Sequence, residues 1–147
     1  MFDLKELYRQ VLMDHFRNPR HKGLVNNKSY ANVFLTNPGC GDEITMQLKI
    51  ESGKIIDIKH DGKGCSVCCA SASICCERLI NIDISEANRV INEFYKMIKG
   101  IQFDQSLINK DELSLSGVSQ IPARINCASL AWKACEKVLS SKDNSNE

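Results

Sequence analysis

The sequence has no long hydrophobic run and almost no net charge. Its 147 residues carry 19 lysines and arginines against 18 aspartates and glutamates, which gives a formal net charge of +1. No stretch approaches the roughly 20 consecutive apolar residues that a membrane-spanning helix needs. Near-neutrality argues against a large phosphate-binding surface. We therefore expect neither a membrane nor a nucleic acid among the partners of the chain.

An export signal is also missing. The first residues, MFDLKELYRQ, carry charges where a signal peptide has its apolar core, so a cytoplasmic location is expected. In a reducing compartment, cysteines bind metals, perform chemistry or pack in cores, and seldom form disulfides. That expectation applies to all eight cysteines, which stand at positions 40, 65, 68, 69, 75, 76, 127 and 135.

Neither an internal repeat nor a second domain can be recognised. We expect one domain over residues 1–140 and a disordered polar tail, SKDNSNE, over 141–147. The segment 101–120 is less regular and is expected to hold one short helix with loops. The pattern predicts an α+β fold, a small antiparallel three-stranded sheet packed against helices. Hydrophobic periodicity places the strands around 31–36, 44–50 and 56–58 and the longer helices around 3–17, 66–81, 85–99 and 122–140.

Three cysteines lie where a turn bends or a helix begins. Cys40 lies in NPGCGD, Cys65 follows GKG, and Cys127 falls in the early turns of the last predicted helix. A thiol at a helix N-terminus faces unpaired N–H groups, which favour its thiolate. Asp42 can offer a carboxylate beside Cys40 because Gly41 permits a sharp bend. Three thiolates and one carboxylate would complete a tetrahedral zinc shell. Since the chain has no paired C-x2-C knuckle, three unrelated cysteines remain the alternative on spacing alone.

Three segments, NPGCGD, GKGCSVCCASAS and RINCASLAW, occur in this order. They resemble the signature segments of the IscU-like iron–sulfur cluster assembly proteins, the family of the NifU N-terminal domain. The resemblance covers most of the chain and includes HFRNPRHKG near the start. Two features point to the SufU branch of that family. The stretch between Cys65 and Cys127 is longer than in IscU, and SQIPARINC replaces the Leu-Pro-Pro-Val-Lys motif of IscU, with Asn126 where IscU has histidine.

The resemblance implies that Cys40, Asp42, Cys65 and Cys127 bind Zn²⁺ and that Cys40 accepts sulfur. The implied function is that of a zinc-dependent sulfurtransferase. Its donor would be a SufS-type pyridoxal-phosphate cysteine desulfurase, and it would pass the sulfur on for iron–sulfur cluster assembly, with iron–sulfur scaffold proteins as downstream partners. The charge of such a shell, rather than the resemblance, suggests a role for Arg124 as a catalytic-site cation that moderates the surplus negative charge, and the alternative is a solvated arginine at the start of a helix.

Two other functions stay open. The same ligands could hold a labile 2Fe–2S cluster on a scaffold that assembles and transfers it, because thiolates suit both zinc and iron. A purely structural zinc domain is the third possibility. It fits less well, because structural sites usually use closed shells of cysteine and histidine.

The other cysteines and the histidines are expected to be structural. An auxiliary thiol one helical turn from Cys65 is the alternative for Cys68 or Cys69. His15 stands alone in the sequence and is expected on the helix surface or partly buried. The cysteines predicted to pack in the core are Cys68, Cys69, Cys75, Cys76 and Cys135.

Overall fold

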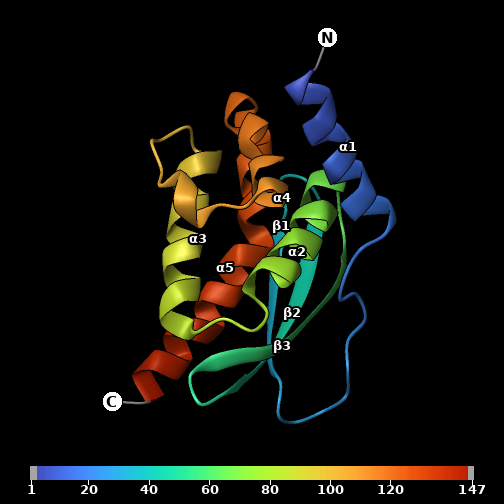
Figure 1. Ribbon diagram of the computed structural model, residues 1–147. Helices are drawn as coiled ribbons and strands as arrows, with labels where there is room; N and C mark the ends of the chain where they lie inside the picture. The colour runs from blue at the N-terminus through green and yellow to red at the C-terminus, as the bar shows by residue number, and fades with distance from the viewer. Residues whose placement is uncertain (1–2, 146–147) are drawn as a thin grey trace.

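The computed structural model describes residues 3–145. Within that range the chain forms five α-helices, two short 3-10 helices and one three-stranded sheet (Figure 1). In chain order the elements are α1 (Leu4–Arg17), β1 (Ala31–Asn37), β2 (Asp42–Glu51), β3 (Lys54–Lys63), α2 (Ser66–Leu79), α3 (Ile84–Ile98), η1 (Gln105–Leu107), α4 (Lys110–Leu113), η2 (Ser116–Gln120) and α5 (Pro122–Ser145).

The sheet is antiparallel throughout, with strand order β1-β2-β3. The alternation of Ile44, Met46 and Leu48 puts these side chains on the buried face of β2, and all three are at most 3% exposed. β3 is longer than predicted, because its pairing with β2 continues as far as Lys63. The α+β class and the three-stranded antiparallel sheet are confirmed.

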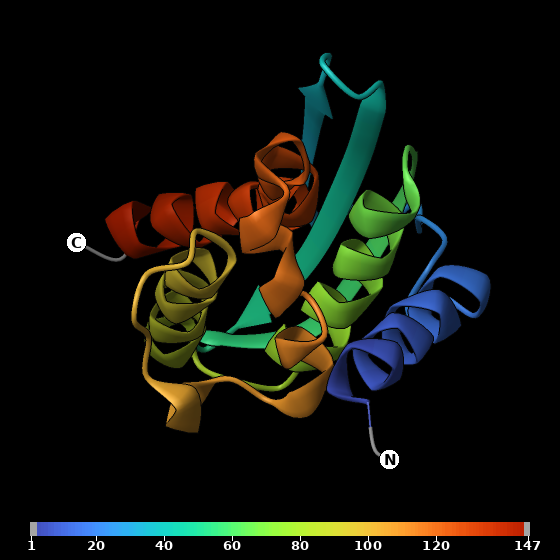
Figure 2. The same cartoon turned by 90° about the horizontal axis from the view of Figure 1, so that it is seen from above.

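Two helices cover one face of this sheet. α5 packs on β1 and β2, α2 packs on β3, and the two helices pack on each other (Figures 1 and 2). α2 is rich in alanine, serine and cysteine, and these small side chains allow close approach of its neighbours. Four of the cysteines predicted in the core are buried, namely Cys68, Cys75, Cys76 and Cys135. Cys69 differs, because it is partly exposed.

The last helix is longer than predicted. α5 continues to Ser145 rather than ending near Ser140, since neither glycine nor proline interrupts the sequence there. Residues 141–145, which were predicted to belong to a disordered tail, are therefore helical. Residues 146–147 lie outside the described range. None of the helices described here is long and apolar enough to cross a membrane.

The expectation for His15 is wrong, because its ring is only 1% exposed. Nδ1 lies 2.8 Å from the Ser73 hydroxyl, and Nε2 lies 2.8 Å from a carboxylate oxygen of Asp111. Ser73 Oγ already accepts the backbone N–H of Arg20, so its own O–H is free to donate to the ring. The imidazole thus ties α1 to α2 and α4. Sequence inspection missed it because its partners lie 58 and 96 residues away.

A buried ion pair anchors the irregular segment before α5. Glu112 in α4 is fully buried, and its Oε1 accepts hydrogen bonds from Arg78 Nε at 2.8 Å and from the Asn109 backbone N–H at 3.1 Å. Its Oε2 has no hydrogen-bond partner. Burial raises the pKa of Glu112 to about 7, although Arg78 and the Asn109 N–H oppose that shift.

This carboxyl predicts a pH-dependent stability. Its pKa in the folded chain lies above the unfolded value, so the folded state keeps a proton that the unfolded state has lost. Stability should therefore fall as pH rises from about 4.5 to about 7, by on the order of 3 kcal/mol. Glu112→Gln removes the titration and preserves the capping box. Urea unfolding of the metal-free chain at pH 5 and pH 8 should show this loss in the wild type but not in Glu112→Gln. The exposed control Glu51→Gln should keep the wild-type difference, and equal differences in all three proteins would refute the prediction.

Candidate metal centre

A four-residue turn between β1 and β2 carries the first candidate ligand. The Cys40 N–H donates to the Asn37 carbonyl at 3.1 Å, and the Gly41 N–H donates to the Pro38 carbonyl at 3.3 Å. Gly41 has φ +70°, a left-handed conformation that glycine adopts without strain. The turn therefore holds Cys40 partly exposed at the end of the hairpin.

Asp42 begins β2 and points inward, with 1% exposure. Its Oδ1 accepts the backbone N–H of Cys65 at 2.9 Å, so the carboxylate is fixed against the start of α2. Gly64 leaves the room for this contact. A Cβ atom at position 64 would lie 2.3 Å from Asp42 Oδ1, closer than such atoms can approach.

The other two cysteines come from the helices that cover the sheet. Cys65 is the N-cap of α2, and its Sγ accepts the Cys68 backbone N–H at 3.5 Å. Cys127 lies in the second turn of α5 and is fully buried. The turn between β1 and β2 and the first turns of α2 and α5 lie at the same end of the molecule (Figures 1 and 2).

Three of the four predicted ligands meet closely. One ligand atom each from Cys40, Asp42 and Cys127 lies within 4.8 Å of the others. Cys65 lies beside this group without belonging to it at that limit. It is joined to the group through its N–H bond to Asp42 and through the thiol of Cys127, with which it interacts. The structure thus gathers the four predicted residues from three separate parts of the sequence.

The electrostatics of the group suit a cation. Burial raises the pKa of the Cys127 thiol, and hydrogen bonding with Asp42, Cys40 and Cys65 adds to this shift. The expected stabilisation of a Cys127 thiolate by the helix end is not found, because the macrodipole acts within the first turn and Cys127 lies beyond it. Arg124 does reach the site. Its guanidinium interacts with Cys127 and Cys65, and this raises the pKa of Arg124.

A divalent cation fits this donor set. Thiolates and a carboxylate are ligands that Zn²⁺ accepts, and a cation would offset the cost of ionising thiols that crowd together. Because Gly64 has no side chain, the Asp42 carboxylate has room to lie beside the thiols, where it offers an oxygen ligand.

Sequence inspection missed one residue of the site. Asn37 ends β1 directly opposite Asp42, and its side-chain amide donates to Asp42 Oδ2 at 3.3 Å and to Cys127 Sγ at 3.5 Å. The available signal was its place at the head of NPGCGD, where a four-residue turn returns the chain to the neighbouring strand.

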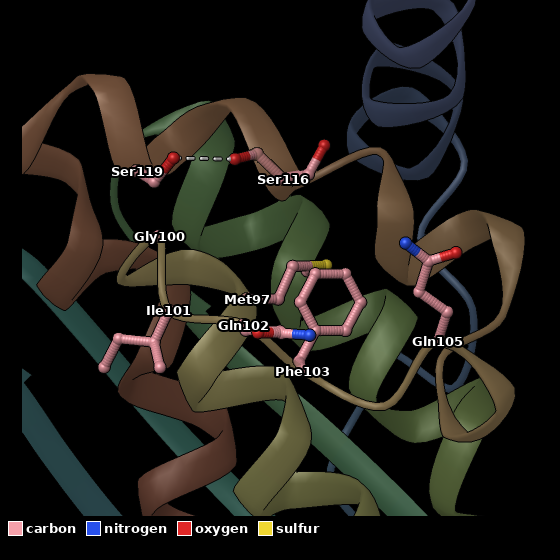
Figure 3. A pocket seen from close by; sticks show the side chains of 8 residues that line it. All are labelled: Met97, Gly100, Ile101, Gln102, Phe103, Gln105, Ser116 and Ser119. Carbon is pink, nitrogen blue, oxygen red and sulfur yellow. Dashed lines mark hydrogen bonds between the residues drawn. The ribbon is translucent and has the colours of Figure 1, made fainter.

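Two other places in the structure, a second cluster of ligating side chains and an open pocket, lack the chemistry of this centre. His15, Glu77 and Asp111 also place ligand atoms within 4.8 Å of one another, but Arg20 Nε already lies 3.2 Å from Glu77 Oε1 and supplies a cation there. An open pocket of about 690 Å³ lies at the end of α3 (Figure 3). It has no titratable side chain, since it is lined by Met97, Gly100, Ile101, Gln102, Phe103, Gln105, Ser116 and Ser119.

Comparison with known proteins agrees with this geometry. The family model of the NifU-like N-terminal domain matches residues 7–127. The chain is 41% identical to the zinc-dependent sulfurtransferase SufU of Bacillus subtilis, over 98% of this chain and 97% of that protein. It is 34% identical to the iron–sulfur cluster assembly scaffold protein IscU of Thermotoga maritima, over 92% and 94% of the two chains.

A solved structure from Fervidobacterium islandicum shares the fold. It is described as a proposed iron–sulfur cluster assembly scaffold protein for the SUF system. It superposes with a TM-score of 0.81 at 27% identity and covers 93% of this chain and 99% of that one. The chain belongs to the NifU-like N-terminal domain family. The resemblance seen in its three segments is confirmed, and similarity to SufU extends over nearly its full length.

Proposed function

We propose that this chain is a zinc-dependent sulfurtransferase that accepts persulfide sulfur on Cys40 and passes it on for iron–sulfur cluster assembly. One observation carries the proposal. Cys40 meets Asp42 and Cys127 within 4.8 Å, yet it is partly exposed on a turn with a glycine on each side. A ligand that only held the fold together would have no need of such access. The 41% identity to a zinc-dependent sulfurtransferase supports the same conclusion.

Zn²⁺ would be held by Cys40, Asp42, Cys65 and Cys127. When bound, it keeps thiolates deprotonated, and it is itself redox-inert. Three thiolates and a carboxylate carry more negative charge than one divalent ion neutralises. The Arg124 guanidinium, which interacts with Cys127 and Cys65, would offset part of that surplus.

The sulfur step uses the Cys40 thiolate. It attacks the outer sulfur of a persulfide on the catalytic cysteine of a SufS-type pyridoxal-phosphate cysteine desulfurase. A new S–S bond forms at Cys40, the S–S bond of the donor breaks, and the donor cysteine leaves as a thiolate with the electron pair. No external oxidant or reductant is needed. We place this exchange in the cytoplasm, where thiols remain reduced, with iron–sulfur scaffold proteins as later acceptors.

Cys40→Ala tests the proposal. With the cysteine desulfurase of the same organism, the wild-type chain should stimulate sulfide release in the presence of a reductant, and Cys40→Ala should lose that stimulation. Cys69→Ala is the matched control, since it removes a partly exposed thiol that is not a proposed ligand. Bound zinc, measured in parallel, should be about one per wild-type chain. Stimulation that survives Cys40→Ala would exclude Cys40 as the acceptor.

A scaffold for a 2Fe–2S cluster is the second candidate. It is supported by the similarity to the IscU scaffold of Thermotoga maritima and by a donor set that also suits iron. The two functions differ in what the chain carries. A coloured cluster that forms on the chain and passes to an apo-acceptor, together with no stimulation of the desulfurase, would favour the scaffold.

A further inference from the structure

We propose that Asn37 is a positioning residue that holds Cys127 and Asp42 in place, so that ligand exchange at the zinc site is confined to Cys40. The inference rests on the proposed function. Asn37 contacts three of the four proposed ligands. Its carbonyl accepts the Cys40 N–H at 3.1 Å, and its side-chain Nδ2 donates to Asp42 Oδ2 at 3.3 Å and to Cys127 Sγ at 3.5 Å.

The four ligands are supported unequally. Asp42 accepts the backbone N–H of Cys65 as well as the amide of Asn37. The Cys65 sulfur accepts the Cys68 N–H, and the Cys127 sulfur accepts Asn37 Nδ2 and also interacts with Arg124.

The Cys40 sulfur receives no N–H hydrogen bond from the described part of the chain. Cys40 Sγ lies 3.7 Å from the carbonyl oxygen of Ala123, which can accept from a thiol but repels a thiolate, and Cys127 Sγ lies 4.0 Å from the same oxygen. Hydrogen-bond donors around a metal orient its ligands and stabilise their negative charge. Release of Cys40 therefore breaks no N–H···S bond, whereas release of Cys127 breaks the bond from Asn37.

The local structure explains why an amide suits this position. Asn37 pairs with Asp42 across β1 and β2, and the proline that follows it favours an extended backbone, which fixes the direction of the side chain. The Nδ2 atom carries two hydrogens, so one nitrogen can donate to Asp42 and to Cys127 at once. Neither aspartate nor leucine, which have similar size, can donate to either ligand.

The test uses Asn37→Leu and Asn37→Asp, with Asn32→Leu as the control. Asn32 lies on the same strand and bonds to Tyr30 and Gln47 but to none of the proposed ligands. Zinc affinity is measured by competition with a chelator. Zinc-loaded protein is then treated with iodoacetamide, and the labelling rate of each cysteine is followed by mass spectrometry. The partly exposed Cys69 serves as the internal reference.

Both Asn37 variants should bind zinc about 10–100-fold more weakly, the range typical of a lost outer-shell partner. In the wild type and in Asn32→Leu, Cys40 should react well ahead of Cys127. In the Asn37 variants the ratio of these two rates should fall, because Cys127 has lost its N–H donor, while the burial of Cys127 keeps it the slower of the two.

An unchanged labelling ratio would overturn the proposal even if zinc affinity fell, since a merely structural role would weaken binding without changing which ligand leaves. Circular dichroism and thermal unfolding of the metal-free proteins establish that the variants fold. If Asn37→Leu does not fold, the nearly isosteric Asn37→Asp decides. None of these measurements contains a desulfurase. The Asn37 result and the Cys40→Ala result can therefore fail independently.

Discussion

Replacing Gly64 with alanine is expected to abolish tight metal binding while leaving the fold in place. The added methyl group would lie 2.3 Å from Asp42 Oδ1 and 3.1 Å from the Asp42 Cα atom. A carboxylate that moves away to relieve this clash loses its hydrogen bond to the Cys65 N–H. That bond links Asp42, which follows the turn that carries Cys40, to the start of α2. One methyl group therefore disturbs two of the four proposed ligands.

The expected loss in zinc affinity for Gly64→Ala is at least the 10–100-fold that a lost outer-shell partner costs, because here a ligand itself is displaced. Overpacking of this kind typically costs about 1–3 kcal/mol of stability, which a folded domain tolerates. Zinc content after dialysis and chelator competition are the measurements. Gly117→Ala is the matched control, since a Cβ atom there meets nothing within 4 Å and its φ is not positive. A Gly64→Ala protein that retained wild-type affinity would show that the Asp42 carboxylate is not held as described.

The sequence predicted the fold well where a local pattern carries the information. Alternation at Ile44, Met46 and Leu48 identified the central strand, and GKG before Cys65 marked the start of a helix. Local patterns indicated the candidate ligands only in part. Cys40 and Asp42 stand on either side of Gly41, and Cys65 opens a helix, but the set of four ligands was implied by the resemblance to the IscU-like family.

What the sequence could not predict depends on partners that are far apart along the chain. Nothing within the segment GKG shows that a side chain at Gly64 would strike Asp42, which lies 22 residues earlier. Asn37 reaches Cys127 across 90 residues, and His15 is buried only because Ser73 and Asp111 meet it. Such roles follow from the packing of α2 and α5 on the sheet rather than from any motif.

That packing leads to the second large effect, which is expected for Trp132→Ala. Trp132 is fully buried in α5, and its ring stacks on Phe94 with centroids 4.0 Å apart. Its indole N–H donates to Ser71 Oγ at 2.9 Å, and the Ser71 hydroxyl donates to the Ala128 carbonyl at 2.6 Å. Truncation to alanine should cost about 3–5 kcal/mol and lower the melting temperature by about 10–15 °C.

Trp132→Phe separates the ring from its N–H group. It keeps an aromatic ring against Phe94 and should lose distinctly less stability than Trp132→Ala, as measured by thermal unfolding of the metal-free chain. Equal losses would mean that the indole N–H, rather than the packed ring, carries the effect.

The same contacts bear on the metal centre. Ser71 belongs to the helix that Cys65 caps, and Ala128 follows Cys127, so the bond between them fixes how α2 lies against α5. The spacing of two proposed ligands is thus set by the hydrophobic core, and Trp132→Ala should weaken zinc binding in its folded fraction more than Trp132→Phe does.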